Sequence, residues 1–246
     1  MQERVSEARD LHEAELLFDV EPSDAASKNH GALVPRQAKA CIHIRKDLGV
    51  DVSEDLLAFA RGRNTRDWLT YSYGDAAALS SPDASFDLAV SAQALEYVEE
   101  PDRALAEMFR VLKPGGRALI MNTDWDRVAW VSSNQDRMMR VRRAWEEHCA
   151  HPRLPQTLVP RLRAAGFRIA EVSTFSITNT RLEQGTYSHG LVEFIRDFLA
   201  ERETVEPHEL AAWADELRSL SAEGRYFFAT TRCFFGVSKP GGTPDE

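Results

Sequence analysis

The sequence has few cysteines, almost no glycine near its start and no long apolar run. Its three cysteines, Cys41, Cys149 and Cys233, form no C-x-x-C pair, so we expect buried free thiols rather than a disulfide framework or a zinc site. No stretch reaches the roughly 20 apolar residues that a membrane span requires. The N-terminal segment also lacks the apolar core of a signal peptide. These absences predict a cytoplasmic protein that binds no metal and does not span a membrane.

The chain also lacks an excess of positive charge. Its formal net charge of −9 argues against a broad surface for nucleic acid, because phosphate binding needs clustered Lys and Arg. Hydrophobic residues make up 43 % of the 246 residues, which is enough to fill a substantial core. We therefore expect a small-molecule partner and no nucleic acid, whereas the sequence predicts no oligomeric state.

Strand and helix patterns alternate through the middle of the sequence, as is typical of a parallel sheet covered by helices. Leu48 to Val50 forms a short apolar run, and Ser53 can cap a helix that Gly62 helps to end. Trp68 to Tyr73 is rich in β-favouring residues and predicts a second strand. Phe86 to Ser91 is nearly continuous in apolar residues, which indicates a strand buried on both faces.

One more helix and strand complete this region. Pro101 suits the first turn of a helix, and apolar residues recur on one face after it. Lys113 to Gly116 predicts a stop and a turn, and Arg117 to Asn122 predicts the next strand. The apolar helix face consists of Ala104, Leu105, Met108, Val111 and Leu112.

Long helical patterns dominate the second half of the chain. The predicted helices span residues 132–150, 158–165, 191–199 and 207–220, and strands are predicted at 167–175 and 226–237, the latter buried on both faces. The predicted fold class is α/β, a Rossmann-like doubly wound, mostly parallel sheet with a final antiparallel strand and helical insertions.

A single domain over residues 1–246 is the simplest organisation. Residues 1–47 form an atypical N-terminal part, and residues 126–160 and 183–224 are expected as helical insertions. The Pro/Gly-rich tail at 239–246 is expected to be flexible.

Three motifs carry a resemblance to a known family. They are GVDVSEDLLAFAR (49–61), GDAAALSSPDASFDLAVSAQALEYV (74–98) and RVLKPGGRALI (110–120). In this order and spacing the chain resembles class I S-adenosylmethionine-dependent methyltransferases that act on small molecules. NTDWD (122–126) and the segment YFFATTRCFF are similar to a bacterial group that resembles the ubiquinone and menaquinone C-methyltransferases.

The resemblance implies a site for S-adenosylmethionine at the carboxyl edge of the sheet, where doubly wound folds bind cofactors. A carboxylate at Asp51 suits two ribose hydroxyls, and one at Asp75 can accept from an exocyclic amine. In the family the corresponding acids bind the ribose and the adenine amino group, and the loop after the third strand lies along the methyl end. The implied cofactor-binding residues are Asp51, Val52, Asp75, Ala76, Gln93 and Ala94.

Each of these residues also has a structural interpretation. Taken alone, Asp51 can cap a helix and Asp75 can form a turn; their joint order favours the site. Trp125, Trp130, Trp145 and Trp213 could line an acceptor pocket, although aromatic residues at helical spacing are more often core. His148, His151, His189, Tyr187 and Tyr226 are candidate bases by residue type alone, so no catalytic residue is nominated.

The chain departs from the family in its first segment. The family's glycine-rich loop, D-x-G-x-G-x-G, is absent: Gly31 is the only glycine before Gly49, and Leu16 to Asp24 is the nearest match. Glycines let backbone N–H groups approach a ligand closely, so the loss bears on activity. Three explanations are open: a divergent loop that still binds cofactor, a degenerate relative without catalysis, or an N-terminal region out of the ancestral reading frame.

The sequence thus predicts methyl transfer from S-adenosylmethionine to a small-molecule acceptor. A non-catalytic protein on the same fold is the first alternative, because the glycine loop is lost. A nicotinamide-dependent oxidoreductase is the second alternative, although its G-x-G-x-x-G motif is also missing.

Overall fold

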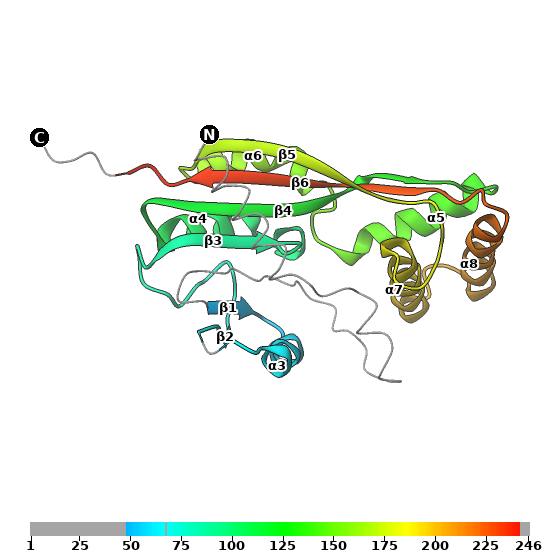
Figure 1. The fold of residues 1–246 in the computed structure, drawn as a ribbon, viewed down its shortest axis with the longest axis horizontal. Helices are drawn as coiled ribbons and strands as arrows, with labels where there is room; N and C mark the ends of the chain where they lie inside the picture. The colour runs from blue at the N-terminus through cyan, green and yellow to red at the C-terminus, as the bar shows by residue number, and fades with distance from the viewer. Residues whose placement is uncertain (1–47, 67, 242–246) are drawn as a thin grey trace, which may run out of the picture.

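The computed structural model describes residues 48–66 and 68–241, and the atypical segment 1–47 lies outside the described residues. Figure 1 shows a sheet part and a helical part side by side along the long axis of the molecule. The described part begins with a small parallel unit, β1 (Leu48–Asp51), α3 (Glu54–Arg63) and β2 (Thr70–Tyr73). Ser53 caps α3, as predicted, by accepting a hydrogen bond from the Leu56 N–H.

The larger sheet has four strands in the order β3-β4-β6-β5. These are β3 (Phe86–Ala92), β4 (Leu112–Trp130), β5 (Arg168–Asn179) and β6 (Phe228–Ser238). Strands β3 and β4 are parallel, whereas β6 runs antiparallel to both β4 and β5. The predicted α/β fold with a mostly parallel sheet and a final antiparallel strand is confirmed.

Helices α4 (Pro101–Val111) and α6 (Leu154–Ala164) cover one face of this sheet. The apolar face predicted for α4 is completely buried, since Leu105 and Met108 are both 0 % exposed. Besides α4 and α6, the shared core includes side chains from β1, from the loop after β2 and from β6. These are Val50, Ala76, Leu79, Phe235 and Val237.

Strand β6 differs from its prediction, because it is not buried on both faces. Phe235 and Val237 are buried under the helices, whereas Arg232 and Phe234 on the opposite face are only partly buried. On the neighbouring strand, Phe175 is 45 % exposed. The reason is that α4 and α6 both pack on the face of Phe235, so an aromatic sequence does not by itself require two covered faces.

The helical part packs α5 (Gln135–Trp145), α7 (Tyr187–Arg202) and α8 (Pro207–Ala222) against the far ends of β4 and β6. Two short 3-10 helices, η1 (Leu95–Tyr97) and η2 (Glu146–His148), lie beside the junction of the two parts. The helical part has its own hydrophobic core. All four tryptophans considered for an acceptor pocket lie in it and are at most 8 % exposed. They are Trp125, Trp130, Trp145 and Trp213.

Strand β4 is longer than the segment predicted for it. It begins directly after α4, and Lys113 to Gly116 forms an irregularity within the strand, with Gly115 at φ +80°, rather than a separate stop and turn. It also continues to Trp130, so the first residues of the segment expected to be helical, 126–130, are extended. Pairing with β6 holds this extension in place, for Trp130 pairs with Phe228.

The start of the predicted tail is fixed to the sheet part. The Lys239 ammonium donates to the carbonyls of Phe109 (2.8 Å) and Leu112 (2.7 Å), which caps the carboxyl end of α4. The Lys239 N–H donates to Gly116 O at 2.8 Å. Residues 242–246 lie outside the described part of the chain.

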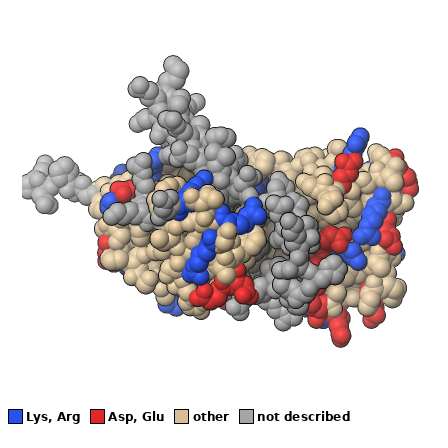
Figure 2. Space-filling model, turned by 60° about the horizontal axis from the view of Figure 1, so that its bottom comes forward, with Lys and Arg blue, Asp and Glu red and all other residues tan. Residues whose placement is uncertain are grey.

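Two further observations concern the surface and the thiols. Within the described ranges, no helix combines the length and the apolar character needed to cross a bilayer. Figure 2 shows cationic and anionic side chains interspersed on one face, and the exclusion of nucleic acid stays a prediction. Cys149 is buried and Cys233 partly buried, and both are free thiols, whereas Cys41 falls in the undescribed segment.

Candidate functional site

The carboxyl ends of β1 and β2 bring two of the predicted acids to one edge. Asp51 is the last residue of β1, is 2 % exposed, and its Oδ1 accepts the Ser53 N–H at 2.8 Å. Its own carbonyl accepts the Gly74 N–H at 3.0 Å, which holds the start of the next loop beside it. Asp75 therefore follows directly after the neighbouring strand end, as the sequence predicted.

Asp75 and Ala76 have contrasting environments. The Asp75 side chain is exposed, and its Oδ1 accepts the Ala77 N–H at 2.8 Å, which is the turn geometry of an Asx motif. Ala76 is 3 % exposed and packs in the sheet core, while Val52 is partly buried. The capping and turn interpretations of the two acids are thus realised locally, and they leave both carboxylates at the ligand-binding edge of a parallel sheet.

The third predicted element, the loop after β3, has a constrained backbone. Gln93 is a non-glycine residue at φ +53°, a conformation that side chains disfavour and that clusters at functional sites. Its N–H donates to Met121 O at 2.8 Å, and its side-chain amide lies 2.7 Å from Thr123 Oγ1. Ala94 next to it is completely buried. Gln93 and Ala94 follow a strand of the four-stranded sheet, whereas Asp51 and Asp75 follow strands of the small sheet.

Beyond Gln93, a group of polar side chains lies where the sheet part meets the helical part; we call it the junction cluster. Its members come from the loop after β3 and from η1, β4, α7 and β6, which are far apart in the sequence. They are linked by hydrogen bonds, ring contacts and mutual charge effects. The cluster consists of Gln93, Glu96, Tyr97, Asn122, Thr123, Tyr187 and Arg232.

Glu96 is the buried centre of the junction cluster. It is 0 % exposed, accepts a hydrogen bond from the Asn122 side-chain amide, and has no partner among the described residues for Oε1. Burial raises the pKa of Glu96 to about 8, and this exceeds the opposing effects of backbone N–H groups and of the Arg232 charge. At neutral pH the Glu96 carboxyl is therefore mainly protonated and uncharged.

Tyr187 and Arg232 form the partly exposed side of the junction cluster. The guanidinium carbon of Arg232 lies 5.3 Å from the centroid of the Tyr187 ring, within the range of a cation–π contact. Burial raises the pKa of Tyr187, although the charge of Arg232 opposes the increase. Tyr187 is thus the one of the five candidate bases that belongs to the junction cluster.

The remaining candidate bases have structural surroundings. The His148 ring stacks on Trp145 at a centroid distance of 3.8 Å, and burial lowers the pKa of His148 to about 4. Tyr226 is 3 % exposed and its hydroxyl accepts from Trp130 Nε1 at 3.1 Å. His151 contacts a backbone carbonyl at 3.2 Å, and His189 lies on the first turn of α7.

The tryptophan cluster also serves packing. Trp125, Trp130, Trp145 and Trp213 border a cavity of about 20 Å³, which is room for one water molecule and too little for a metabolite. The core interpretation therefore fits these four residues better than an acceptor pocket in this structure.

Sequence reasoning missed Glu96, Thr123 and Arg232 as site residues. Two signals were present: a single carboxylate inside the apolar run ALEYV, and a single arginine inside the aromatic strand YFFATTRCFFGV. A charged residue in an otherwise apolar segment is seldom buried without a partner or a task. Thr123 offered no signal, since only the pairing of β4 with β6 places it opposite Arg232.

Residues 29–120 match a family model described as a methyltransferase domain. The chain is 39% identical over 80 residues to a demethylmenaquinone methyltransferase of Symbiobacterium thermophilum, covering 31% of this chain and 32% of the relative. It is 44% identical over 71 residues to a malonyl-[acyl-carrier protein] O-methyltransferase of Methylococcus capsulatus, covering 28% of this chain and 26% of the relative.

A solved structure supports the fold. A proposed methyltransferase of Bacillus halodurans superposes with a TM-score of 0.50 and 21% identity, covering 78% of this chain and 82% of that one. The curated relatives are matched over only about a quarter to a third of their length. The structural similarity thus extends over most of the chain. The sequence similarity is limited to the segment that contains Asp51 and Asp75.

Proposed function

We propose that this chain is a class I S-adenosylmethionine-dependent methyltransferase and that it transfers a methyl group from S-adenosylmethionine to a small-molecule acceptor. The observation that carries the proposal is the meeting of Asp51 and Asp75 at adjacent carboxyl ends of parallel strands, within the matched segment. Ligands of doubly wound sheets bind at this edge.

The described residues fit the nucleoside of such a cofactor. Asp51 presents a carboxylate at a strand end, and two ribose hydroxyls are suitable donors to it. Asp75 is exposed and can accept from an exocyclic amine, while buried Ala76 offers its backbone to the adenine ring. Gln93 and Ala94, on the loop after β3, are assigned to the methyl end of the cofactor.

The chemistry asks little of the protein beyond positioning. S-adenosylmethionine, when bound, supplies a methyl group on a sulfonium whose neutral thioether is a good leaving group. The side chains therefore have to bind, orient and exclude water. A base is needed only where the acceptor loses a proton during the reaction. Gln93 joins the loop after β3 to the rest of the junction cluster through Thr123, so we assign acceptor binding to those other members of the cluster.

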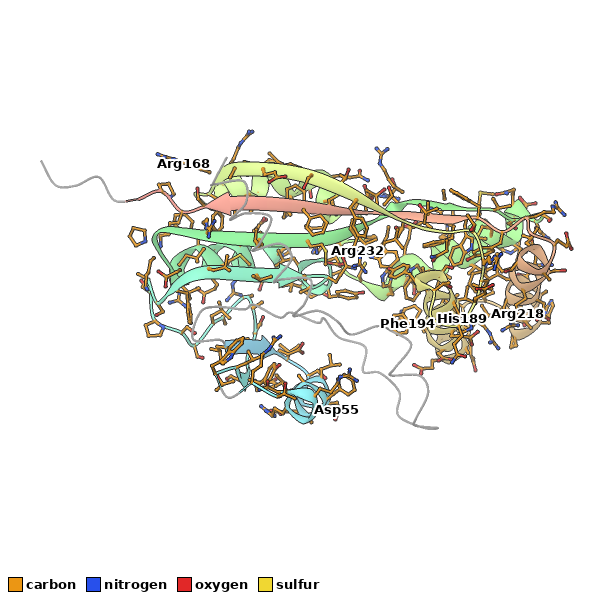
Figure 3. The ribbon with its side chains drawn as sticks, in the orientation of Figure 1. Asp55, Arg168, His189, Phe194, Arg218 and Arg232 are labelled. Carbon is orange, nitrogen blue, oxygen red and sulfur yellow. The ribbon has the colours of Figure 1, made fainter. Side chains whose placement is uncertain are left out.

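Calorimetric titration with S-adenosylhomocysteine tests the proposal. We expect binding by the wild type and at least about tenfold weaker binding by Asp51→Ala, because hydrogen bonds to a charged group are lost. Asp51→Asn, which keeps the shape of the side chain, should weaken binding too. Asp55→Ala is the matched control, since Asp55 is an exposed carboxylate on α3 (Figure 3) and should leave binding unchanged.

The outcomes separate the alternatives. Absence of any heat of binding at millimolar ligand would overturn the cofactor assignment and favour a non-catalytic protein on this fold. Equal binding by the wild type and Asp51→Ala would overturn the site but not the cofactor. Saturation-transfer signals from NAD in place of S-adenosylhomocysteine would support the oxidoreductase.

A further inference from the structure

Arg232 is a partly buried cation with no anionic partner among the described residues. It lies on β6 opposite Thr123 of β4 and Phe175 of β5, and is only partly exposed. Its Nε is buried and has no hydrogen-bond partner in residues 48–66 and 68–241. Among the described residues, no carboxylate approaches its guanidinium within ion-pair distance, although most other arginines of these ranges have such a partner.

The described groups around Arg232 do not neutralise it at pH 7. Glu96 is the carboxyl whose pKa responds to the Arg232 charge, and burial raises that pKa to about 8, so the group is mainly uncharged. Burial also raises the pKa values of Tyr97, Cys149 and Tyr187, which are neutral as well. The junction cluster therefore carries a net positive charge in a partly desolvated place, which is costly unless an anion binds there.

Thr123 connects Arg232 to Gln93, the residue that we assign to the methyl end of the cofactor. Thr123, the strand partner of Arg232, has its hydroxyl 2.7 Å from the Gln93 amide. Gln93 is the strained residue after β3 to which we assign the methyl end of the cofactor. A group bound by Arg232 would thus lie one strand away from that loop. Figure 3 shows Arg232 near the junction with the helical part, whereas Arg168 lies at the opposite end of the sheet.

We propose that Arg232 and Tyr187 recognise an acidic oxygen of the methyl acceptor, so that the acceptor is a small molecule carrying a carboxylate, enolate or phenolate. This inference rests on the proposed function, because it names the acceptor class of that site. A planar guanidinium can bind such an oxygen with two donors, and the Tyr187 hydroxyl adds a third. The positive charge also keeps the acidic group of the acceptor ionised.

Benzoate and benzamide are suitable probes, because they share size and shape but differ in charge. We expect ligand-observed NMR titration at pH 7, with and without S-adenosylhomocysteine, to show benzoate binding the wild type at least about tenfold more tightly than benzamide. Arg232→Gln should remove this preference. Arg168→Gln is the matched control, an exposed arginine of the same sheet, and should keep it.

Two further variants guard against a loss of folding in Arg232→Gln. Arg232→Lys keeps the charge but loses the paired donors, so a reduced preference for benzoate should remain. Tyr187→Phe keeps the ring and removes one donor, and should weaken benzoate binding a few-fold while benzamide is unaffected. Thermal unfolding of each variant tests whether the fold is retained.

The pH dependence gives an independent test. Glu96 is faced by Arg232 of β6, Tyr187 of α7, Tyr97 of its own 3-10 helix and Cys149 after η2. Ionisation of Glu96 above pH 8 places a negative charge near Arg232, so the preference for benzoate should decrease as the pH rises from 7 to 9. Glu96→Gln should abolish that decrease.

The results distinguish this proposal from the proposed function. Equal binding of benzoate and benzamide by a wild type that binds S-adenosylhomocysteine would overturn the acidic-acceptor proposal alone. A preference for benzoate that survives in Arg232→Gln would overturn it as well. Arg232-dependent benzoate binding without any binding of S-adenosylhomocysteine would support the anion site and contradict the methyltransferase activity.

Discussion

The sheet part and the helical part of this molecule have cores of different composition. The sheet core is mainly aliphatic, with Leu105, Met108 and Ile120 packed between strands and helices. The helical core is built around tryptophans, and three of their indole nitrogens, including that of Trp213, have no hydrogen-bond partner among the described residues. Leucine and isoleucine side chains bring no polar atom into a core, whereas each buried indole brings one N–H group that needs a partner.

This difference separates the two halves of the proposed site. The residues assigned to the cofactor follow strand ends of the sheet part and are close together in the sequence. The members of the junction cluster other than Gln93, which are assigned to the acceptor, need both parts, because Tyr187 begins α7 and Arg232 lies on the last strand. We therefore expect cofactor binding and acceptor binding to respond to different substitutions.

The largest expected effect contrasts the two cores. Trp213→Ala removes a side chain that is 0 % exposed in the helical part, and should lower the free energy of unfolding by about 3–5 kcal/mol. Leu105→Ala, equally buried in the sheet part, should cost about 2–5 kcal/mol. Urea unfolding followed by tryptophan fluorescence and by circular dichroism measures both.

The matched control is Trp68→Ala, because Trp68 is 54 % exposed and should change the free energy of unfolding by less than about 1 kcal/mol. A helical part that folds independently would show two transitions, with Trp213→Ala shifting only one of them. A single transition shifted by both core variants would mean that β4 and β6 couple the two parts.

A smaller expected effect is the pH dependence of stability that Glu96 causes. The pKa of Glu96 is raised from 4.5 to about 8, so its contribution to stability is complete below pH 4.5 and is lost as the pH rises through 8. Glu96→Gln removes this titration. Relative to the wild type, the variant should gain more than about 1 kcal/mol of stability between pH 5 and pH 9, as measured by chemical denaturation. A constant difference would contradict the raised pKa.

His148 should show the opposite pH dependence. Burial lowers its pKa from 6.5 to about 4, so its contribution to stability is complete above pH 6.5 and is lost as the pH falls towards 4. His148→Phe preserves a ring beside Trp145 and cannot titrate. Between pH 7 and pH 4 the variant should lose less stability than the wild type, by more than about 1 kcal/mol. Equal losses in both proteins would show that other groups control acid unfolding.

Local signals in the sequence predicted the elements well. Ser53 and Pro101 mark the starts of α3 and α4, and the 3.6-residue periodicity gave the buried face of α4 correctly. The positions of Asp51 and Asp75 at one sheet edge also followed, because Asp51 ends β1 and Asp75 comes two residues after the end of β2. These features depend only on residues that are close together in the sequence, so they can be predicted from a single sequence.

Features that depend on distant pairing could not be predicted. The extension of β4 to Trp130 requires β6 as a partner, and the partial exposure of Phe234 depends on which face the helices cover. The junction cluster joins Glu96 to Arg232 across more than half of the chain, and no periodicity connects them. The only sequence signal for Glu96 and Arg232 was that each is a single charged residue in an apolar segment.

The most direct test of this division is calorimetric titration of S-adenosylhomocysteine into the wild type, Asp51→Asn and Arg232→Gln. The account predicts that Asp51→Asn binds at least about tenfold more weakly, whereas Arg232→Gln binds like the wild type. The contradicting result is a similar loss of binding in both variants, which would place Arg232 in the cofactor site instead of the acceptor site.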